Sequence, residues 1–220
     1  NVKFACVGYS VSGSINGCID FVDSQTLNTY LNRSYGTSRT VGFGGPNASH
    51  LQSAASAYRV SDECGAMAIR YADANLSFRN GANRIYVNFT DEGNQPAGRQ
   101  EYSVEFFKSQ QNWSTSQGTV HTVYSGSTNS TWVTYSWEKP WLISDYTGGT
   151  SFFTDGSFSG VSLASLPVTG AMRNSYVIRF YNIANLVNDG QIHLLKMTVM
   201  TKDGQVRAER VFNVTFVLSK

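Results

Sequence analysis

The sequence has 220 residues, a formal net charge of +2 and only 15% charged side chains. That length buries one good core, or one domain with a small appendage. Lysine and arginine are scattered, which argues against a nucleic-acid surface, and no apolar run reaches the roughly 18 residues of a membrane span. Aromatic residues at 13%, 20 glycines and abundant Ser, Thr and Asn are typical of an exported protein. We therefore expect an extracellular, cell-surface or periplasmic location.

Apolar patterns near the amino terminus predict two strands and a helix. Residues Val2–Tyr9 and Cys18–Val22 are expected to be short strands, and an amphipathic helix begins at Leu27–Leu31. The stretch Thr37–Ser49 is rich in Gly, Ser and Thr, and we expect it to be a long surface loop.

The strongest helix prediction covers Ser61–Leu76. Ser61 is a candidate N-cap and Glu63 a first-turn acid, which the helix dipole favours. The spacing of the apolar residues predicts a buried stripe that consists of Met67, Ile69, Ala72 and Leu76.

A turn at Asn80-Gly81 and a buried strand follow this helix. The apolar side of that strand consists of Ile85, Val87 and Phe89. Asp91 comes directly after it, and open α/β sheets bind ligands beyond the carboxyl ends of their strands. We expect Asp91 to lie above the middle of the sheet, where its carboxylate could ligate a cation, hold a catalytic proton or cap the next helix.

The next elements continue an alternating order. Residues 98–112 are predicted to form a helix, 118–124 a strand, 138–146 a helix and 151–153 a strand. This alternation predicts an α/β fold with a mainly parallel, Rossmann-like sheet and helices on both faces.

The carboxyl-terminal part has strand patterns with almost no helix signal. These patterns occupy residues 175–183, 191–201 and 205–218. Asp203-Gly204 predicts a hairpin turn between the last two. About 50 residues with three strands are too few for an independent sandwich. We therefore expect a main domain at 1–165 and a small antiparallel, β-rich extension at 166–220.

With these elements placed, the chain resembles a von Willebrand factor type A domain. VKFACVGYS resembles the second strand of that family, and SDECGAMAIRYADANLSFRNGANRIYVNFTDE its third helix and fourth strand. GTVHTVYS resembles the fifth strand, and LISDYTGGTSFF the helix, turn and strand that close the sheet. SDECGAMAI is also similar to the integrin β-subunit I-like domains. The likeness spans about residues 1–165 and is most specific in NGANRIYVNFTDE.

The resemblance implies a metal-ion-dependent adhesion site (MIDAS) on top of the sheet. In the family this site uses a D-x-S-x-S motif after the first strand, a Thr or Glu in a middle loop and an Asp after the fourth strand. Asp91 matches the last position, and Glu63 matches the middle one in the integrin-like alignment. Such oxygen ligands suit Mg²⁺ or Ca²⁺, and a carboxylate of the partner can fill an open position. Glu92 is expected to be solvated.

The chain departs from the family because it contains no D-x-S-x-S motif. The segment Gly8–Ser12 keeps both serines but has glycine in place of the aspartate. The chain also begins at Asn1 without Met or a signal-like segment, so we expect a processed form or a fragment. The first strand and helix are then expected to have been cleaved away or to lie on another polypeptide, and the metal to bind weakly or to be absent.

These features predict an extracytoplasmic adhesion domain that binds a protein or glycan partner through a MIDAS-type site, without turnover. The missing amino-terminal segment or another chain would complete the sheet, and the tail could be half of a β-sandwich. No G-x-S-x-G elbow, HExxH or P-loop occurs, and the spacing of Cys64 from the histidines does not favour a nucleophile pair, so we expect no enzyme. The alternative is a structural or assembly module with a degenerate metal site.

Overall fold

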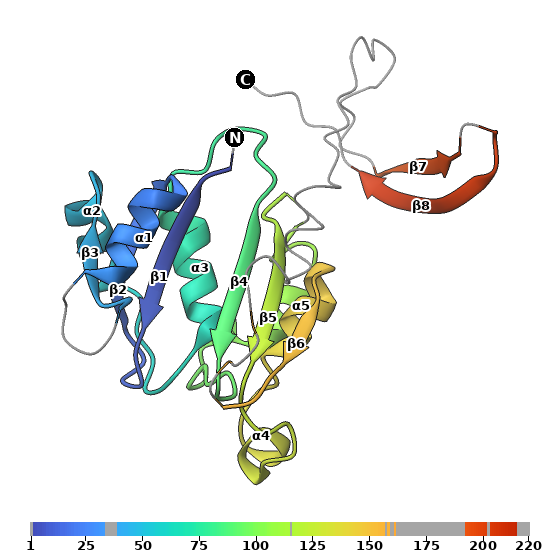
Figure 1. The fold of residues 1–220 in the computed structure, drawn as a ribbon. Helices are drawn as coiled ribbons and strands as arrows, with labels where there is room; N and C mark the ends of the chain where they lie inside the picture. The colour runs from blue at the N-terminus through green and yellow to red at the C-terminus, as the bar shows by residue number, and fades with distance from the viewer. Residues whose placement is uncertain are drawn as a thin grey trace. The chain divides into compact units, whose positions relative to one another are not determined.

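The computed structural model describes residues 2–33, 39–114, 116–156, 158, 161, 192–201 and 203–214. The chain divides into two compact units, residues 1–175 and residues 176–220. The first unit is mixed α/β, with strands and helices packed together (Figure 1). The boundary predicted near residue 165 falls among residues outside the described ranges and stays a prediction. Within those ranges, no helix combines the length and apolarity needed to cross a membrane.

The first sheet of the amino-terminal unit contains three strands. β1 (Phe4–Tyr9) and β2 (Ile15–Val22) form an antiparallel hairpin, and β3 (Gly42–Gly44) pairs with β2 in parallel. Gly17 permits the close approach of β3, because a Cβ at Gly17 would lie 1.8 Å from the Thr40 carbonyl oxygen. Two of the predicted strands are thus confirmed, although their pairing is antiparallel.

Helices cover both faces of this sheet. They are α1 (Ser24–Asn32) and α2 (Ala48–Ala55). Tyr30 of α1 packs beside Ile19 of β2, whereas Leu51 of α2 belongs to the same buried cluster as Cys18. Consecutive strand residues point to opposite faces, so α1 and α2 lie on opposite sides.

The second sheet is fully parallel, and the prediction of a parallel sheet is confirmed for its strands. They are β4 (Ile85–Thr90), β5 (Thr119–Tyr124) and β6 (Ser151–Phe153), in that spatial order. Thr90 lies opposite Tyr124, so β4 and β5 end at the same edge. The expectation of one mainly parallel sheet is wrong in one respect: the described strands of this unit form two separate sheets.

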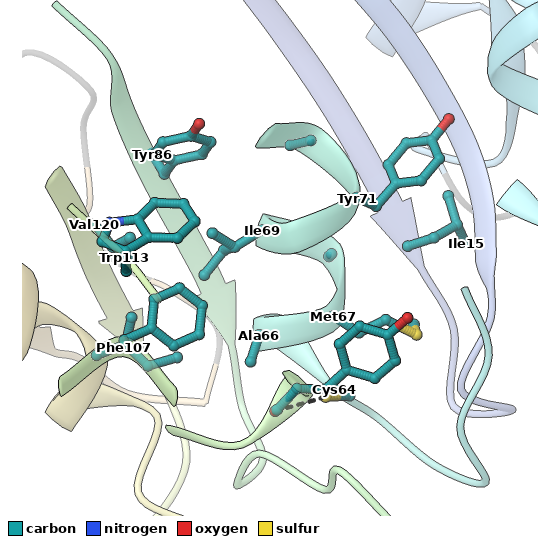
Figure 2. Packing of buried hydrophobic residues seen from close by; sticks show 14 of the residues in the cluster. Ile15, Cys64, Ala66, Met67, Ile69, Tyr71, Tyr86, Phe107, Trp113 and Val120 are labelled. Atoms are coloured by element: carbon teal, nitrogen blue, oxygen red, sulfur yellow. Dashed lines mark hydrogen bonds between the residues drawn. The ribbon is translucent and has the colours of Figure 1, made fainter. Parts of the chain in front are cut away.

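Helix α3 (Gly65–Asn75) packs against both β1 and β4 and thereby joins the two sheets (Figure 1). Figure 2 shows its inward side chains between the β1–β2 hairpin on one side and the aromatic rings of Tyr86, Phe107 and Trp113 on the other. The Trp113 ring centroid lies 4.9 Å from that of Phe107 and 5.5 Å from that of Tyr86. Seven residues of the helix are buried: Gly65, Ala66, Met67, Ala68, Ile69, Tyr71 and Ala72. A helix is confirmed within the predicted range 61–76, although it begins at Gly65, and Leu76, expected in its buried stripe, is the C-cap and is only half-buried.

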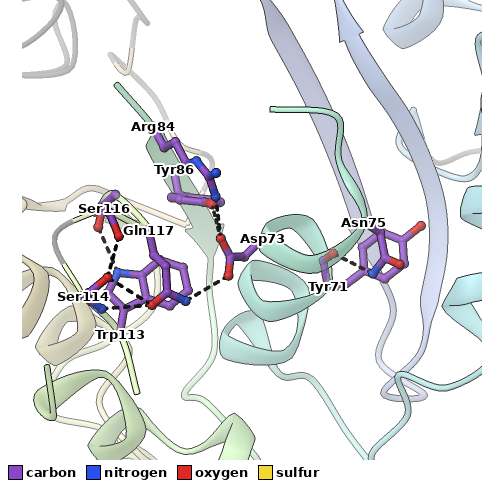
Figure 3. A network of polar contacts seen from close by, with 10 residues as sticks. Tyr71, Asp73, Asn75, Arg84, Tyr86, Trp113, Ser114, Ser116 and Gln117 are labelled. Carbon is purple, nitrogen blue, oxygen red and sulfur yellow. Dashed lines mark hydrogen bonds and ion pairs between the residues drawn. The ribbon is translucent and has the colours of Figure 1, made fainter. Parts of the chain in front are cut away.

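A polar network fastens the end of α3 to the second sheet (Figure 3). The Asp73 carboxylate accepts hydrogen bonds from Arg84 Nη1 at 3.0 Å, the Tyr86 hydroxyl at 3.2 Å and Gln117 Nε2 at 2.9 Å. Arg84 also stacks on the Phe78 ring, 4.2 Å from its centroid. One carboxylate therefore joins the helix, the start of β4 and the loop before β5.

Two sequence predictions in this unit were wrong. Residues 98–112 do not form one α-helix; they contain two short 3₁₀ helices, η1 (Gln100–Tyr102) and η2 (Val104–Lys108). The stretch 37–49 is not only a loop, because it includes β3 and the start of α2. By contrast, α5 (Trp141–Thr147) and β6 lie where a helix and a strand were expected.

In the carboxyl-terminal unit, the described residues form an antiparallel hairpin. β7 (His193–Met200) pairs with β8 (Val206–Val214), and Asp203-Gly204 lies in the turn. Gly204 has a φ of 82°, which glycine adopts without strain. The predicted hairpin is confirmed, and the strand expected at 175–183 lies outside the described residues.

Candidate acidic site and aromatic surface

Asp91 is exposed and follows β4 directly, as expected. However, β4 is the outer strand of its three-stranded sheet, so Asp91 does not lie above the middle of that sheet. Beyond β4 lies the end of β1: the Tyr9 hydroxyl donates to Asn88 Oδ1 and to the Phe89 carbonyl oxygen, each at 3.3 Å. Asp91 therefore lies at an edge where elements of both sheets meet.

Glu63 lies just before α3 and not inside its first turn, because the helix begins at Gly65 with Cys64 as its N-cap. The role of Ser61 as N-cap was therefore predicted wrongly. The Glu63 backbone carbonyl accepts a hydrogen bond from the Gln95 N–H at 3.0 Å, so the loop that follows Asp91 is fastened to the start of α3.

The structure brings the two predicted residues into electrostatic range of each other. Glu63 is half-buried, and its pKa is raised to about 7, first by burial and then by repulsion from Glu92, Asp91 and Asp62. No ion pair within the described ranges involves any of these four carboxylates. We call Asp62, Glu63, Asp91 and Glu92 the acidic cluster.

Sequence reasoning missed Asp62 and treated Glu92 as solvated only. Both are half-buried and contribute to the repulsion that acts on Glu63. Their positions in the sequence could have indicated this role, since Asp62 directly precedes Glu63 and Glu92 directly follows Asp91.

The donor set is chemically suited to a hard cation but is incomplete. Carboxylate oxygens are the ligands that Mg²⁺ and Ca²⁺ prefer. Within the described part of the chain, however, no group of three or more His, Cys, Asp or Glu residues is arranged to hold a metal ion. Ser10 and Ser12, from the segment once compared with D-x-S-x-S, lie in the turn after β1 with their hydroxyl oxygens 2.8 Å apart. Further donors would have to come from elsewhere.

The buried side chain of Asn94 links the loop of the acidic cluster to the start of α3. The Asn94 side chain accepts hydrogen bonds from the Ala66 N–H at 3.0 Å and from Cys64 Sγ at 3.2 Å. It donates to the Tyr102 carbonyl at 3.0 Å and to Glu138 Oε2 at 2.7 Å. These bonds fix the loop that carries Asp91 and Glu92 against the start of α3.

Cys64 serves this arrangement as a buried structural residue. Burial raises the pKa of its thiol to about 12, so the thiol is protonated at neutral pH. Of the histidines, His121 is buried in β5; its Nδ1 accepts a hydrogen bond from the Thr150 N–H at 3.1 Å, and burial lowers its pKa.

A second feature of the same edge was not predicted. Helix α4 (Thr131–Tyr135) projects beyond the ends of β4 and β5 (Figure 1). Its loop touches the acidic segment at two glycines: a Cβ at Gly126 would lie 2.0 Å from the Asp91 carbonyl oxygen, and one at Gly93 would lie 2.5 Å from Trp137 Cβ. The acidic cluster and the α4 loop therefore adjoin.

Replacing Glu63 by glutamine is expected to remove a pH-dependent destabilisation. The pKa of Glu63 is higher in the folded chain than in the unfolded chain, so a protonated Glu63 stabilises the fold relative to an ionised one. This contribution to the free energy of unfolding is complete below pH 4.5 and is lost as the pH rises through about 7. After allowance for solvent screening, Glu63→Gln should raise the free energy of unfolding by about 1 kcal/mol near pH 8 and leave it unchanged near pH 4. Urea denaturation at both pH values measures this difference.

The matched control is Glu105→Gln, which changes an exposed glutamate on η2. It should alter the free energy of unfolding by less than about 0.5 kcal/mol at either pH. An equal effect of Glu63→Gln at both pH values would contradict the electrostatic interpretation.

Comparisons with known proteins add no family assignment. No family model, no curated protein and no solved structure matches the chain.

Proposed function

We propose that the amino-terminal unit is an adhesion or ligand-binding domain of the von Willebrand factor A type, outside the cytoplasm, with a cation-dependent site at the acidic cluster. The observation that carries this proposal is the gathering of four carboxylates, in which the half-buried Glu63 lies within electrostatic range of Glu92, Asp91 and Asp62. A divalent cation would relieve the repulsion among them. The position of Asp91 after a parallel strand supports the same assignment.

Asp91 and Glu63 would hold the ion, Mg²⁺ or Ca²⁺, through their carboxylates. The ion would supply an electrophilic centre to which an acidic group of a protein or glycan partner can bind. Asn94 accepts a hydrogen bond from the Ala66 N–H and so holds the loop that carries Asp91 against the start of α3. Because the described donors are few, the affinity for the ion alone should be low.

The arrangement of the strands supports a further part of this proposal. β1 and β4 each pair on one side only within the described residues, and both contact α3. A strand between them would pair with both and join the two sheets into one. Another chain, or protein sequence beyond these residues, would supply this strand and further oxygen ligands.

The second candidate is a structural or assembly module whose metal site is degenerate. The observation that favours it is the lack of a group of three potential metal ligands in the described part of the chain. In that case the acidic cluster would be a solvated surface, and partners would bind elsewhere.

Isothermal titration with MgCl₂ and with CaCl₂ separates the two candidates. We expect the wild-type chain to bind one ion weakly, and tenfold excess over the dissociation constant to raise the free energy of unfolding by about 1.4 kcal/mol. Asp91→Asn should abolish both effects. Asp145→Asn, which changes an exposed aspartate on α5, is the matched control and should retain them. An equal response of the wild type and Asp91→Asn would exclude the cation site.

A further inference from the structure

Three aromatic side chains form a surface on the α4 loop, which we call the aromatic surface: Trp132, Tyr135 and Trp137. Trp132 is 61% exposed and Tyr135 is 82% exposed. The rings of Trp132 and Trp137 are stacked, with centroids 5.6 Å apart and planes inclined by 21°. Exposed groups of large apolar side chains often mark interaction sites.

The backbone around this surface is held in place. Ser130 caps α4 by accepting a hydrogen bond from the Val133 N–H at 3.2 Å, and the Val133 side chain is buried. The backbone N–H of Trp137 donates a hydrogen bond to the backbone carbonyl of Trp132 at 2.8 Å. A rigid support of this kind lowers the entropy cost of binding a ligand on the rings.

The charges around the rings indicate the kind of ligand. The segment from Ser125 to Trp137 contains no charged residue, and Glu138 and the exposed Lys139 follow it. Gly93, against which Trp137 packs, directly follows Asp91 and Glu92. The surface is therefore aromatic, and the acidic residues beside it outnumber the one lysine. A cation gains from both, because the face of a tryptophan ring attracts a positive charge.

The same contact occurs elsewhere within this protein. The guanidinium carbon of Arg84 lies 4.2 Å from the centroid of the Phe78 ring, and that of Arg70 lies 4.4 Å from the centroid of the Phe106 ring. In the described part of the chain, no lysine or arginine lies over Trp132 or Trp137. The exposed ring of Trp132 is thus open to a cation from another molecule.

We propose that the aromatic surface binds an arginine- or lysine-bearing segment of a protein partner. One cationic side chain stacks on the exposed ring of Trp132 or of Tyr135, and Glu92 and Asp91 attract the positive charges of the same segment. This site goes beyond the cation-dependent function proposed above and does not need a bound metal.

A blocked tetra-arginine peptide tests the inference, with a tetra-citrulline peptide of the same length as its uncharged control. Titrations use the full chain in metal-free, low-salt buffer, with binding followed by calorimetry and by tryptophan fluorescence. We expect the arginine peptide to bind at least about tenfold more tightly than the citrulline peptide, because only the former carries cations for the rings and carboxylates. Equal binding of the two peptides would overturn the inference.

The double variant Trp132→Leu with Tyr135→Leu removes the two exposed rings of the aromatic surface but keeps apolar bulk, and both side chains are exposed, so folding should be unaffected. It should weaken arginine-peptide binding about fivefold, which corresponds to about 1 kcal/mol of cation–π attraction. Phe153→Leu, a change at another exposed aromatic residue, is the control and should bind as the wild type does.

Two other outcomes of this experiment would refute the role of the rings as a cation site. Unchanged binding in the double variant, together with loss of binding in Glu92→Gln, would show that the acidic cluster acts alone. Binding of the citrulline peptide that disappears in the double variant would show an apolar docking surface instead. The peptide titrations contain no divalent metal ion. Their result therefore does not depend on whether the proposed metal site at the acidic cluster exists.

Discussion

Replacing Asn94 by alanine is expected to lower the free energy of unfolding by about 3 kcal/mol. Asn94 is 2% exposed, and its amide group makes four hydrogen bonds. Their partners are Cys64 and Ala66 at the start of α3, Tyr102 in η1, and Glu138. Alanine fills none of these roles, so a buried N–H, a carbonyl and a carboxylate oxygen each lose a hydrogen-bond partner. Urea denaturation near neutral pH measures the change.

Asn112→Ala is the matched control, because Asn112 is exposed and its side chain makes no described hydrogen bond. It should change the free energy of unfolding by less than about 0.5 kcal/mol. Asn94→Ala should also weaken the response to divalent cations, since the loop of Asp91 is no longer fixed against α3. A stability loss no greater than that of Asn112→Ala would show that the network contributes little.

Replacing Gly149 by alanine is expected to destabilise the amino-terminal unit by at least about 3 kcal/mol. Gly149 lies between α5 and β6, and a Cβ there would lie 1.8 Å from the Val120 carbonyl oxygen of β5. The contact is with backbone, so it can be relieved only by shifting β5 or the turn. Such a shift would disturb the central strand of the parallel sheet.

Gly156→Ala provides the comparison for this change, since a Cβ at Gly156 would meet nothing within 4 Å. Its effect on the midpoint of thermal unfolding should be small, whereas Gly149→Ala should lower that midpoint by several degrees or prevent folding. Similar midpoints for the two variants would mean that the turn accommodates a side chain and that the tight approach is not required.

Local periodicity was sufficient for the elements that hold the acidic cluster. The alternating Ile85, Val87 and Phe89 predicted the strand β4, and the apolar stripe that includes Met67 and Ile69 predicted the interior of α3. The expectation that Ile85, Val87 and Phe89 form the buried side of β4 was wrong, because Tyr86, Asn88 and Thr90 are buried there and Phe89 is exposed. The resemblance to von Willebrand factor A domains implied that Asp91 and Glu63 lie near each other, and the structure places them within electrostatic range.

Other elements could not be predicted from local pattern. In residues 98–112, buried Val104 and Phe107 are three positions apart, a spacing that α- and 3₁₀-helices share. The glycines of β3 suggested a loop, yet they allow the strand to approach β2 closely. Glycine in a strand often marks such an approach, but only the partner strand reveals it.

Exposure was the property that sequence described least well. Trp132, Tyr135 and Trp137 have the composition of a core segment, whereas the structure exposes the first two and buries only Val133 of α4. The direction in which a short helix projects depends on its anchor points, and here these are the contacts of the α4 loop with Gly93 and with the Asp91 carbonyl.

The sequence by itself determined the strands β1, β2, β4, β5 and β6, the helices α3 and α5, the hairpin near the carboxyl terminus and the position of Asp91 after β4, because each depends on residues close together in the chain. The tertiary structure decided that β4 is an outer strand, that Asp62 and Glu92 join Glu63 in one acidic cluster, and that an aromatic surface adjoins it. These features depend on contacts between segments far apart in sequence, and electrostatic repulsion and burial act through space.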